Sequence, residues 1–326
     1  MSSVKIIYGT ALWGSQPMET SQGYLDILRR YNVRDIDTAY RYAGSEKALG
    51  ELGAPSSFVI HSKTPGFSDG ALKRDSILAA AKETSQRLGV NNIETYFLHS
   101  PDPITPIEET VEAMQEVYAA GGYKHFGLSN FEAEDVKRIY DFAKSRGYVL
   151  PTVYQGNYNP VGRHYDTTLF PLLRKLRIAF YAYSPLAGGF LVKDPEMFRS
   201  GGGQGRWDPN ERVGAIYRHQ YNKSKLVEAL SEWDSIANDA GVSKAALAYR
   251  WVMYNSMIKP EFGDGIIIGA SRPQQLEQTL RDIEDGPLEA SIAKRIETVW
   301  DLVKDQAPID NYHSYAIEAG LVSQQG

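Results

Sequence analysis

The stretch VRDIDTAYRYAGSEKALGEL, residues 33–52, contains one complete strand, loop and helix unit. Its first five residues carry β-branched Val33 and Ile36, as a short buried strand does. Ser45 followed by Glu46, after a glycine, is typical of a helix start. Units of this kind, repeated along a chain, build a parallel sheet covered by helices.

Eight such strand candidates occur, separated by segments whose apolar residues recur at spacings of three and four. The expected strands are residues 5–10, 33–37, 58–63, 95–99, 125–129, 152–155, 178–183 and 265–268. The clearest expected helices are residues 76–88, 107–120, 133–146 and 288–303. Eight strand and helix units in one chain predict an α/β protein with a (β/α)8 TIM barrel.

The barrel is expected to occupy residues 1–326 as a single domain, because no linker divides the sequence. The first expected strand begins so early that we expect no N-terminal hairpin to cap the bottom of the barrel. A long loop around residues 184–224 contains the glycine-rich run 201–205, and long loops of this kind are often functional. The polar tail from about residue 305 is expected to lie over the barrel or to fray.

The composition argues against some classes of binding partner. With 35 basic and 40 acidic residues the net charge is −5, the opposite sign to that of a phosphate-binding surface. No apolar run approaches the roughly 18 residues of a membrane helix, and the first residues lack the apolar core of a signal peptide. We therefore expect a cytoplasmic protein without nucleic-acid or membrane partners. A homodimer is one of the assemblies that the sequence permits.

Some kinds of chemistry are disfavoured by what the sequence lacks. The chain has no cysteine, so thiolate nucleophiles and thiolate metal ligands are excluded, and no metal site is expected. The sequence also lacks the glycine fingerprint of Rossmann dehydrogenases, the P-loop, the Gly-x-Ser-x-Gly elbow and the His-Glu-x-x-His zinc motif.

Polar residues follow three consecutive expected strands. They are Asp37, Tyr42, Lys63 and His99. Active sites of parallel barrels lie at the C-terminal ends of the strands, so we expect these side chains to converge on one rim. A carbonyl that is being reduced needs a proton donor, and a tyrosine, with a pKa of roughly 10, needs help to serve at neutral pH. A buried Lys63 ammonium would lower that pKa, and Asp37 would keep Lys63 charged.

Each of these residues also has a structural interpretation. Asp37 and Lys63 could form an ion pair that only supports the rim, Tyr42 is one of 21 tyrosines, and a lone histidine at a strand end is often a satisfied core residue. The joint placement on neighbouring strands favours the catalytic interpretation.

Nearly the whole chain resembles the aldo-keto reductase superfamily. The matching motifs are DTAYRY at 37–42, GSE at 44–46, Lys63, LHSPD at 98–102, GLSNF at 127–131, YQGNYN at 154–159, AYSPLAGG at 182–189 and GASRP at 269–273. The resemblance implies a nicotinamide cofactor held in extended form across the barrel mouth. It also implies that Tyr42 is the general acid, that Lys63 and Asp37 tune it, and that His99 orients the carbonyl.

The resemblance also implies a set of cofactor residues. Ser129, Asn130 and Gln155 match groups that bind the nicotinamide carboxamide, and Tyr183 matches the aromatic residue that stacks on its ring. The remaining matches are Ser184, Leu186 and Gly188 at the pyrophosphate, and Arg206, Gly269, Ser271, Arg272, Gln275 and Gln278 at the adenosine phosphate. A guanidinium suits a ribose phosphate, which favours NADPH, although Gln275 stands where many relatives carry another arginine.

Within the superfamily the chain is most similar to the aflatoxin-aldehyde reductase branch, through GRW at 205–207 and IYR at 216–218. That branch grips a substrate carboxylate with two arginines; here the matching places hold Gln220 and the region 312–315. We therefore expect a neutral, aromatic or polyketide-like carbonyl substrate. The substrate residues are expected to be Trp13, His99, Trp207 and Tyr217.

Two other classes of function stay open. Some barrels of this superfamily serve as redox-sensing regulatory subunits that bind nicotinamide with little turnover. A lyase could instead use Lys63 as a Schiff base, although Asp37 disfavours this by keeping Lys63 protonated.

Overall fold

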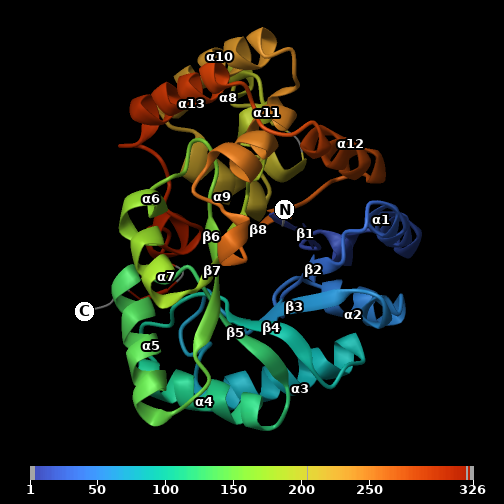
Figure 1. Ribbon diagram of the computed structural model, residues 1–326, viewed down its shortest axis with the longest axis vertical. Coiled ribbons are helices and arrows are strands. Elements are labelled where there is room, and N and C mark those ends of the chain that lie inside the picture. Colours follow the sequence, from blue (N-terminus) through green and yellow to red (C-terminus); the bar gives the residue numbers. More distant parts are fainter. Residues whose placement is uncertain (1–3, 204, 321, 324–326) are drawn as a thin grey trace.

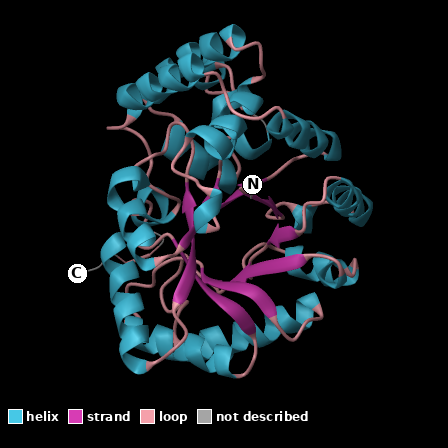
Figure 2. Cartoon of the chain, viewed as in Figure 1, coloured by secondary structure: helices cyan, strands magenta, loops and turns pink. Residues whose placement is uncertain are grey.

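Eight parallel strands close a barrel in this computed structural model, which describes residues 4–203, 205–320 and 322–323 and the side chains of these residues apart from Arg206 and Arg212. The strands are β1 Lys5–Gly9, β2 Asp35–Asp37, β3 Val59–Lys63, β4 Ile93–Leu98, β5 Tyr123–Ser129, β6 Pro151–Asn157, β7 Ala179–Tyr183 and β8 Gly265–Ile268. They lie in chain order, and β8 pairs with β1 to complete the ring (Figure 2). The predicted (β/α)8 barrel is confirmed.

Helices surround the barrel (Figure 1). Those of the first six units are α1 Met18–Arg30, α2 Ser45–Glu51, α3 Arg74–Leu88, α4 Ile107–Ala119, α5 Ala133–Arg146 and, both between β6 and β7, α6 Tyr165–Thr168 and α7 Phe170–Leu176. Those of the last part are α8 Pro195–Arg199, α9 Arg212–Tyr221, α10 Ser224–Asp239, α11 Lys244–Arg250, α12 Pro273–Glu284 and α13 Ala290–Val303. Single turns are η1 Trp13–Ser15, η2 Ala54–Ser56, η3 Ala187–Val192, η4 Gly205–Trp207, η5 Trp251–Asn255, η6 Pro260–Phe262 and η7 Tyr312–Ile317.

Each expected strand and helix is present, with ends that differ by a few residues. β2 begins only at Asp35, because its ladder with β1 runs from Ile7 paired with Asp35 to Gly9 paired with Asp37. β6 is longer than expected and reaches Asn157, which pairs with Tyr183 on β7.

The alternation of side chains along the strands fills the barrel and points selected residues into its mouth. Inside the barrel, Ile7, Phe97, Val153, Tyr181 and Ile267 form an apolar cluster. Gly127 makes room for it, since a Cβ at this position would lie 2.2 Å from the Phe97 ring. His99, Gln155 and Tyr183 each come two residues after a member of this cluster, namely Phe97, Val153 and Tyr181 in that order. They therefore point toward the same mouth of the barrel.

The C-terminal segment lies over the barrel where it is described. After α13 it crosses β6, where the Asn157 side chain donates a hydrogen bond to the Ile309 carbonyl at 3.2 Å. It then forms η7, and beyond η7 the Ser323 amide donates to Asp69 on the β3–α3 loop at 3.0 Å. The tail thus links the end of β6 to the β3–α3 loop.

Candidate active site

A cavity of about 620 Å³ opens at the C-terminal ends of the strands. The predicted site residues that line it are Trp13, Asp37, Tyr42, His99, Ser129, Asn130, Gln155, Tyr183, Ser184, Leu186, Gly188, Trp207, Tyr217, Gly269, Ser271, Gln275 and Gln278. Lys63 lies behind Asp37, fully buried, and Arg272 is exposed at the start of α12 without lining the cavity. The side chain of Arg206 lies outside the described residues.

A buried ion pair holds the centre of the site together. The Lys63 ammonium donates hydrogen bonds to both carboxylate oxygens of Asp37 at 2.7 Å and to the Thr38 carbonyl at 2.8 Å. The Gln155 amide donates to Asp37 at 2.8 Å. Burial lowers the pKa of Lys63 below its usual 10.5, and the charges of Asp37 and Glu46 oppose that shift. Asp37 thereby satisfies an ammonium that would be costly to bury alone.

Tyr42 lies beside this pair, in the turn that follows β2. The turn is closed by backbone hydrogen bonds from Tyr42 to the Ala39 carbonyl and from Ser45 to the Tyr42 carbonyl, both at 2.9 Å. The Lys63 ammonium is 5.0 Å from the centre of the Tyr42 ring, and the His99 ring meets that ring edge-on at 5.9 Å. The four predicted catalytic residues therefore converge, and a cation lies where it can stabilise negative charge on a phenol oxygen.

His99 is 7% exposed and electrically neutral at pH 7. Burial lowers its pKa well below the usual 6.5, and the nearby charges of Lys63 and Arg41 act in the same direction. A neutral imidazole can hydrogen-bond a carbonyl oxygen but is a poor proton source at this pH. His99 is therefore suited to hydrogen-bond a carbonyl oxygen, whereas a proton would have to come from Tyr42.

The predicted nicotinamide residues are already ordered by one another. Asn130, at a left-handed φ of 63°, donates to the His99 carbonyl at 2.9 Å and to the Ser129 hydroxyl at 3.1 Å. Its side-chain oxygen accepts from the Tyr183 hydroxyl at 2.8 Å. Burial, followed by the Asp310 charge, raises the pKa of Tyr183 well above 10, so this phenol stays a donor. An amide and an aromatic ring are thus fixed at one side of the cavity.

The predicted pyrophosphate loop is shaped for close backbone approach. Gly188 and Gly189 in η3 have φ values of 65° and 92°, which glycine tolerates best. A Cβ on Gly188 would lie 2.1 Å from the Tyr217 ring, and the Trp207 indole N–H donates to the Gly188 carbonyl at 3.1 Å. The two aromatic residues that were predicted to contact substrate therefore also support this loop.

At the other end of the cavity, the start of α12 carries the predicted adenosine residues. The Ser271 amide donates to the Gln275 side chain at 3.1 Å, and the Gln278 amide donates to Asp282 at 2.7 Å. Sequence reasoning missed several residues that line the cavity, among them Phe67, Asp282 and Asn311, and these three carried no signal.

A cavity with an aromatic face, an amide clamp and a glycine cradle fits a nicotinamide dinucleotide. Comparisons with known proteins agree with this fit. The sequence model of the Aldo/keto reductase family matches residues 5–301. The chain is 42% identical to the oxidoreductase sirO of Leptosphaeria maculans, over 93% of this chain and 95% of that protein. It is 35% identical to human aflatoxin B1 aldehyde reductase member 2, over 84% of this chain and 80% of that protein.

The chain therefore belongs to the aldo/keto reductase family. It is an oxidoreductase of a family that uses nicotinamide cofactors and acts on small carbonyl compounds. Its similarity to the aflatoxin-aldehyde reductases confirms the branch that the motifs favoured.

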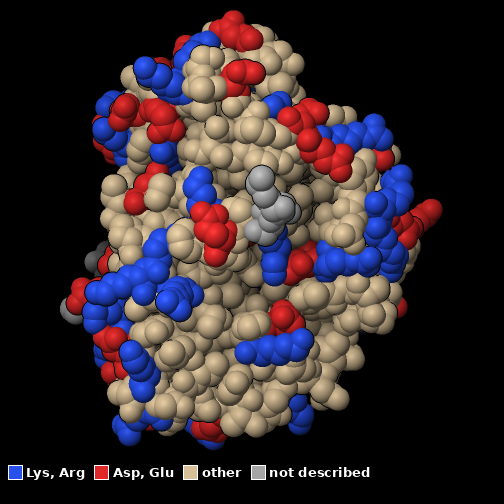
Figure 3. Space-filling view, in the orientation of Figure 1, with Lys and Arg blue, Asp and Glu red and all other residues tan. Residues whose placement is uncertain are grey.

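Three further findings complete the description. Among the described helices, none is both long and apolar enough to cross a lipid bilayer. Basic and acidic side chains are spread together over the face shown in Figure 3. Within the described residues, no group of three or more histidine, aspartate or glutamate side chains is placed to hold a metal ion.

Proposed function

We propose that this protein reduces aldehydes or ketones to alcohols with NADPH, with Tyr42 as the general acid. The observation that carries the proposal is the Asp37–Lys63 ion pair beside Tyr42, with neutral His99 also in contact with the Tyr42 ring. When bound, the nicotinamide supplies the hydride for the carbonyl carbon.

The residues of this chain would perform the remaining work. Tyr42 and His99 hydrogen-bond the carbonyl oxygen, and Tyr42 gives up its proton as negative charge develops there. The Lys63 ammonium stabilises the phenolate that is left, and Asp37 holds Lys63 in place. Ser129, Asn130 and Gln155 would hold the carboxamide, and Tyr183 the ring face, so that one side of the ring faces the substrate.

The phosphate end supports NADPH over NADH. Arg206 and Arg272 are the expected partners of a ribose phosphate. Asp282 lines the same end of the cavity and binds the Gln278 amide, so the positive charge there is partly offset. We expect a preference for NADPH that is measurable but not absolute.

The contacts that Gln220 and His313 make with the C-terminal segment favour a substrate that has no carboxylate group. Gln220, which stands where the aflatoxin-aldehyde reductase branch has an arginine, is 1% exposed and donates to the Asn311 side chain at 3.1 Å. The His313 ring bonds Asp310 at 2.9 Å. Both groups are engaged within the protein, which favours neutral, aromatic or polyketide-like carbonyls. A cytoplasmic location and a homodimeric assembly stay predictions.

The Schiff-base alternative is weakened by the contacts of Lys63. A lysine must be deprotonated to attack a carbonyl, whereas this ammonium donates to three oxygen atoms and is fully buried. The regulatory-subunit alternative predicts tight NADPH binding without turnover, and the same assay decides it.

The test compares wild type with Tyr42→Phe. Loss of reduced-nicotinamide absorbance is followed with NADPH and then NADH across neutral aryl aldehydes, diketones and succinic semialdehyde. We expect Tyr42→Phe to abolish turnover while NADPH binding, measured by fluorescence, stays within about twofold of wild type. Turnover retained by Tyr42→Phe would overturn the assignment of the acid. Higher kcat/KM on succinic semialdehyde than on neutral aryl aldehydes would overturn the proposed substrate class.

A further inference from the structure

Phe67, on the loop between β3 and α3, has a backbone conformation that phenylalanine rarely adopts. Its φ is 57°, in the left-handed region where a Cβ is disfavoured. Asn130 and Ser184, two other described residues with positive φ, line the same cavity. A strained backbone persists where the surrounding structure enforces it, and such residues gather at functional sites.

Contacts from the segments that follow β2 and β4, the two strands beside β3, enforce this conformation. The Phe67 amide donates to the Ser100 hydroxyl at 2.8 Å, directly after β4. The Gly66 carbonyl accepts from the Arg41 guanidinium, next to Tyr42. Gly66 itself lies against His99, because a Cβ on Gly66 would be 2.9 Å from the Cβ of His99. The loop is thus fixed by the same strand ends that carry the catalytic residues.

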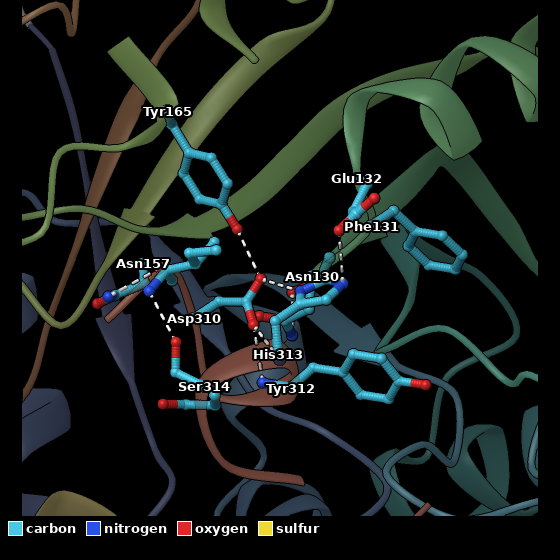
Figure 4. A network of polar contacts seen from close by, with 12 residues as sticks. Asn130, Phe131, Glu132, Asn157, Tyr165, Asp310, Tyr312, His313 and Ser314 are labelled. Carbon is cyan, nitrogen blue, oxygen red and sulfur yellow. Dashed lines mark hydrogen bonds and ion pairs between the residues drawn. The ribbon is translucent and has the colours of Figure 1, made fainter. Parts of the chain in front are cut away.

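The Phe67 ring is consequently the next surface beyond His99. It meets the His99 ring edge-on, with centroids 5.1 Å apart and an interplanar angle of 85°. The Phe67 ring also contacts the ring of Tyr312, from the C-terminal segment, with centroids 6.2 Å apart. Tyr312 is buried, and its amide donates to Asp310 at 2.9 Å (Figure 4). Phe67 is therefore backed by a side chain that is itself held in place.

The order of the three rings has a consequence for the substrate. His99 stands between Tyr42 and Phe67, at 5.9 Å and 5.1 Å. A carbonyl oxygen bound by Tyr42 and His99 puts one substituent of the carbonyl carbon toward Phe67, which lines the cavity. A flat aromatic substituent can stack on that ring, whereas a puckered aliphatic one of the same size cannot.

We propose that Phe67 is a specificity-determining residue that commits the site to carbonyls bearing an aromatic ring. The proposal rests on the carbonyl reduction proposed above and adds the class of substrate that is selected. We call the Phe67 ring, where it lines the cavity, the aromatic wall. The strained φ is then the condition for this wall, because an unstrained loop would turn the ring away from His99.

The experiment uses two aldehydes with the same carbon skeleton, benzaldehyde and cyclohexanecarbaldehyde. The readout is the ratio of their kcat/KM values with NADPH, which cancels changes common to both. We expect this ratio to fall at least about fivefold in Phe67→Ala and Phe67→Leu, since stacking is lost in both. Phe67→Leu keeps a bulky apolar side chain, so it also guards against a collapsed loop.

Two further variants separate the wall from the strain. Phe67→Gly removes the ring and relieves the backbone, so we expect the same loss of selectivity with a Tm no lower than that of Phe67→Ala. Arg177→Gly is the matched control, because exposed Arg177 has the same φ of 57° and does not line the cavity. It should leave the ratio unchanged. A ratio within twofold of wild type in all three Phe67 variants would overturn the proposal.

A binding measurement distinguishes this proposal from the proposed reaction. Benzyl alcohol and cyclohexylmethanol are titrated by calorimetry into the protein loaded with NADP+. If wild type reduces neither aldehyde yet binds benzyl alcohol more tightly in a Phe67-dependent way, the reaction is wrong and the aromatic wall stands. If both aldehydes are reduced with a ratio that ignores Phe67, the reaction stands and the wall is wrong. If neither reduction nor Phe67-dependent binding occurs, both proposals are wrong.

Discussion

The two sides of the catalytic mouth are built in different ways. On the strand side, Asp37, Lys63 and His99 come from β2, β3 and the residue after β4, and regular alternation along the strands aims them at one point. On the tail side, Phe67, Tyr312 and Asp310 come from a loop and the C-terminal segment, and they are placed by contacts between residues far apart in sequence. In the proposed reaction the strand side supplies the reactivity that any carbonyl needs, and the tail side shapes the cavity around the substrate.

The centre of the tail side is Asp310, which is 1% exposed. One of its oxygens accepts from the amides of Tyr312 and His313 at 2.9 Å and 2.7 Å. The other accepts from the Tyr165 hydroxyl at 2.8 Å and meets the His313 ring at 2.9 Å (Figure 4). The residue after it donates from its amide to the Tyr183 hydroxyl at 3.3 Å. This carboxylate therefore joins the tail to the predicted nicotinamide face.

The largest effect is expected from breaking the strand side. Lys63→Met removes the charge that stabilises the phenolate, so kcat should fall by about a hundredfold to ten-thousandfold. NADPH binding should be retained, because Lys63 does not line the cavity. The matched control is Lys5→Met, which removes the ion pair of Lys5 with Asp35 at 3.1 Å on the opposite end of the barrel. If both variants keep near wild-type kcat, the Asp37–Lys63 pair is only structural.

Breaking the tail side should cost stability more than chemistry. Asp310→Asn keeps the shape but replaces a carboxylate oxygen by an amide that cannot accept from Tyr165 and His313 together. We expect the free energy of unfolding to fall by about 2 kcal/mol, and KM for aryl aldehydes to rise more than kcat falls. The measurement is urea unfolding beside steady-state kinetics.

The same segment offers a control for Asp310. Asp305 also pairs with a cation, Lys225, but its side chain is 57% exposed, so Asp305→Asn should change stability far less than Asp310→Asn does. Equal effects of the two substitutions would show that Asp310 does not hold the tail.

The glycine cradle of Gly188 and Gly189 belongs to neither side and should give an intermediate effect. Gly188→Ala strains a φ of 65° and places a Cβ 2.1 Å from Tyr217, so the loop must move. We expect the Kd for NADPH to rise about tenfold with little change in kcat at saturating cofactor. Gly201→Ala has a similar φ of 71° with open space around its Cβ, and it should bind NADPH normally. An unchanged Kd in Gly188→Ala would argue against a phosphate role for this loop.

What the sequence revealed follows the same division. Strand ends were predictable because a period of two fixes which residues face the barrel interior, so the positions of Asp37, Lys63 and His99 follow from the sequence. Phe67 could not, because nothing in its neighbours announces a left-handed φ. Asp310 could not either, since its contact with Tyr165 joins residues 145 positions apart. The strand side can be predicted from local sequence patterns, whereas the tail side depends on tertiary contacts.

The smallest expected effect is a pH dependence that belongs to the tail side alone. Although burial opposes its charged form, the hydrogen bond and charge of Asp310, helped by Glu132 and Asp135, raise the pKa of His313 above 6.5. A raised pKa in the folded state means that this stabilisation is complete below pH 6.5 and is lost as pH rises through the folded value. Wild type should therefore lose on the order of 1 kcal/mol more than His313→Gln between pH 6 and pH 9.

The quantity to compare is the difference in unfolding free energy between wild type and His313→Gln, because the other titrating groups are present in both proteins. Burial lowers the pKa of His99, so the contribution of His99 to the stability of the protein changes in the opposite direction. That contribution is lost as pH falls below 6.5. Subtracting the His313→Gln unfolding curve from that of wild type cancels His99 and leaves the tail. A difference that grows toward high pH, or that does not vary with pH, would mean that the Asp310–His313 contact does not carry charge in the folded protein. The tail would then be held by the Tyr165 and backbone hydrogen bonds of Asp310 alone.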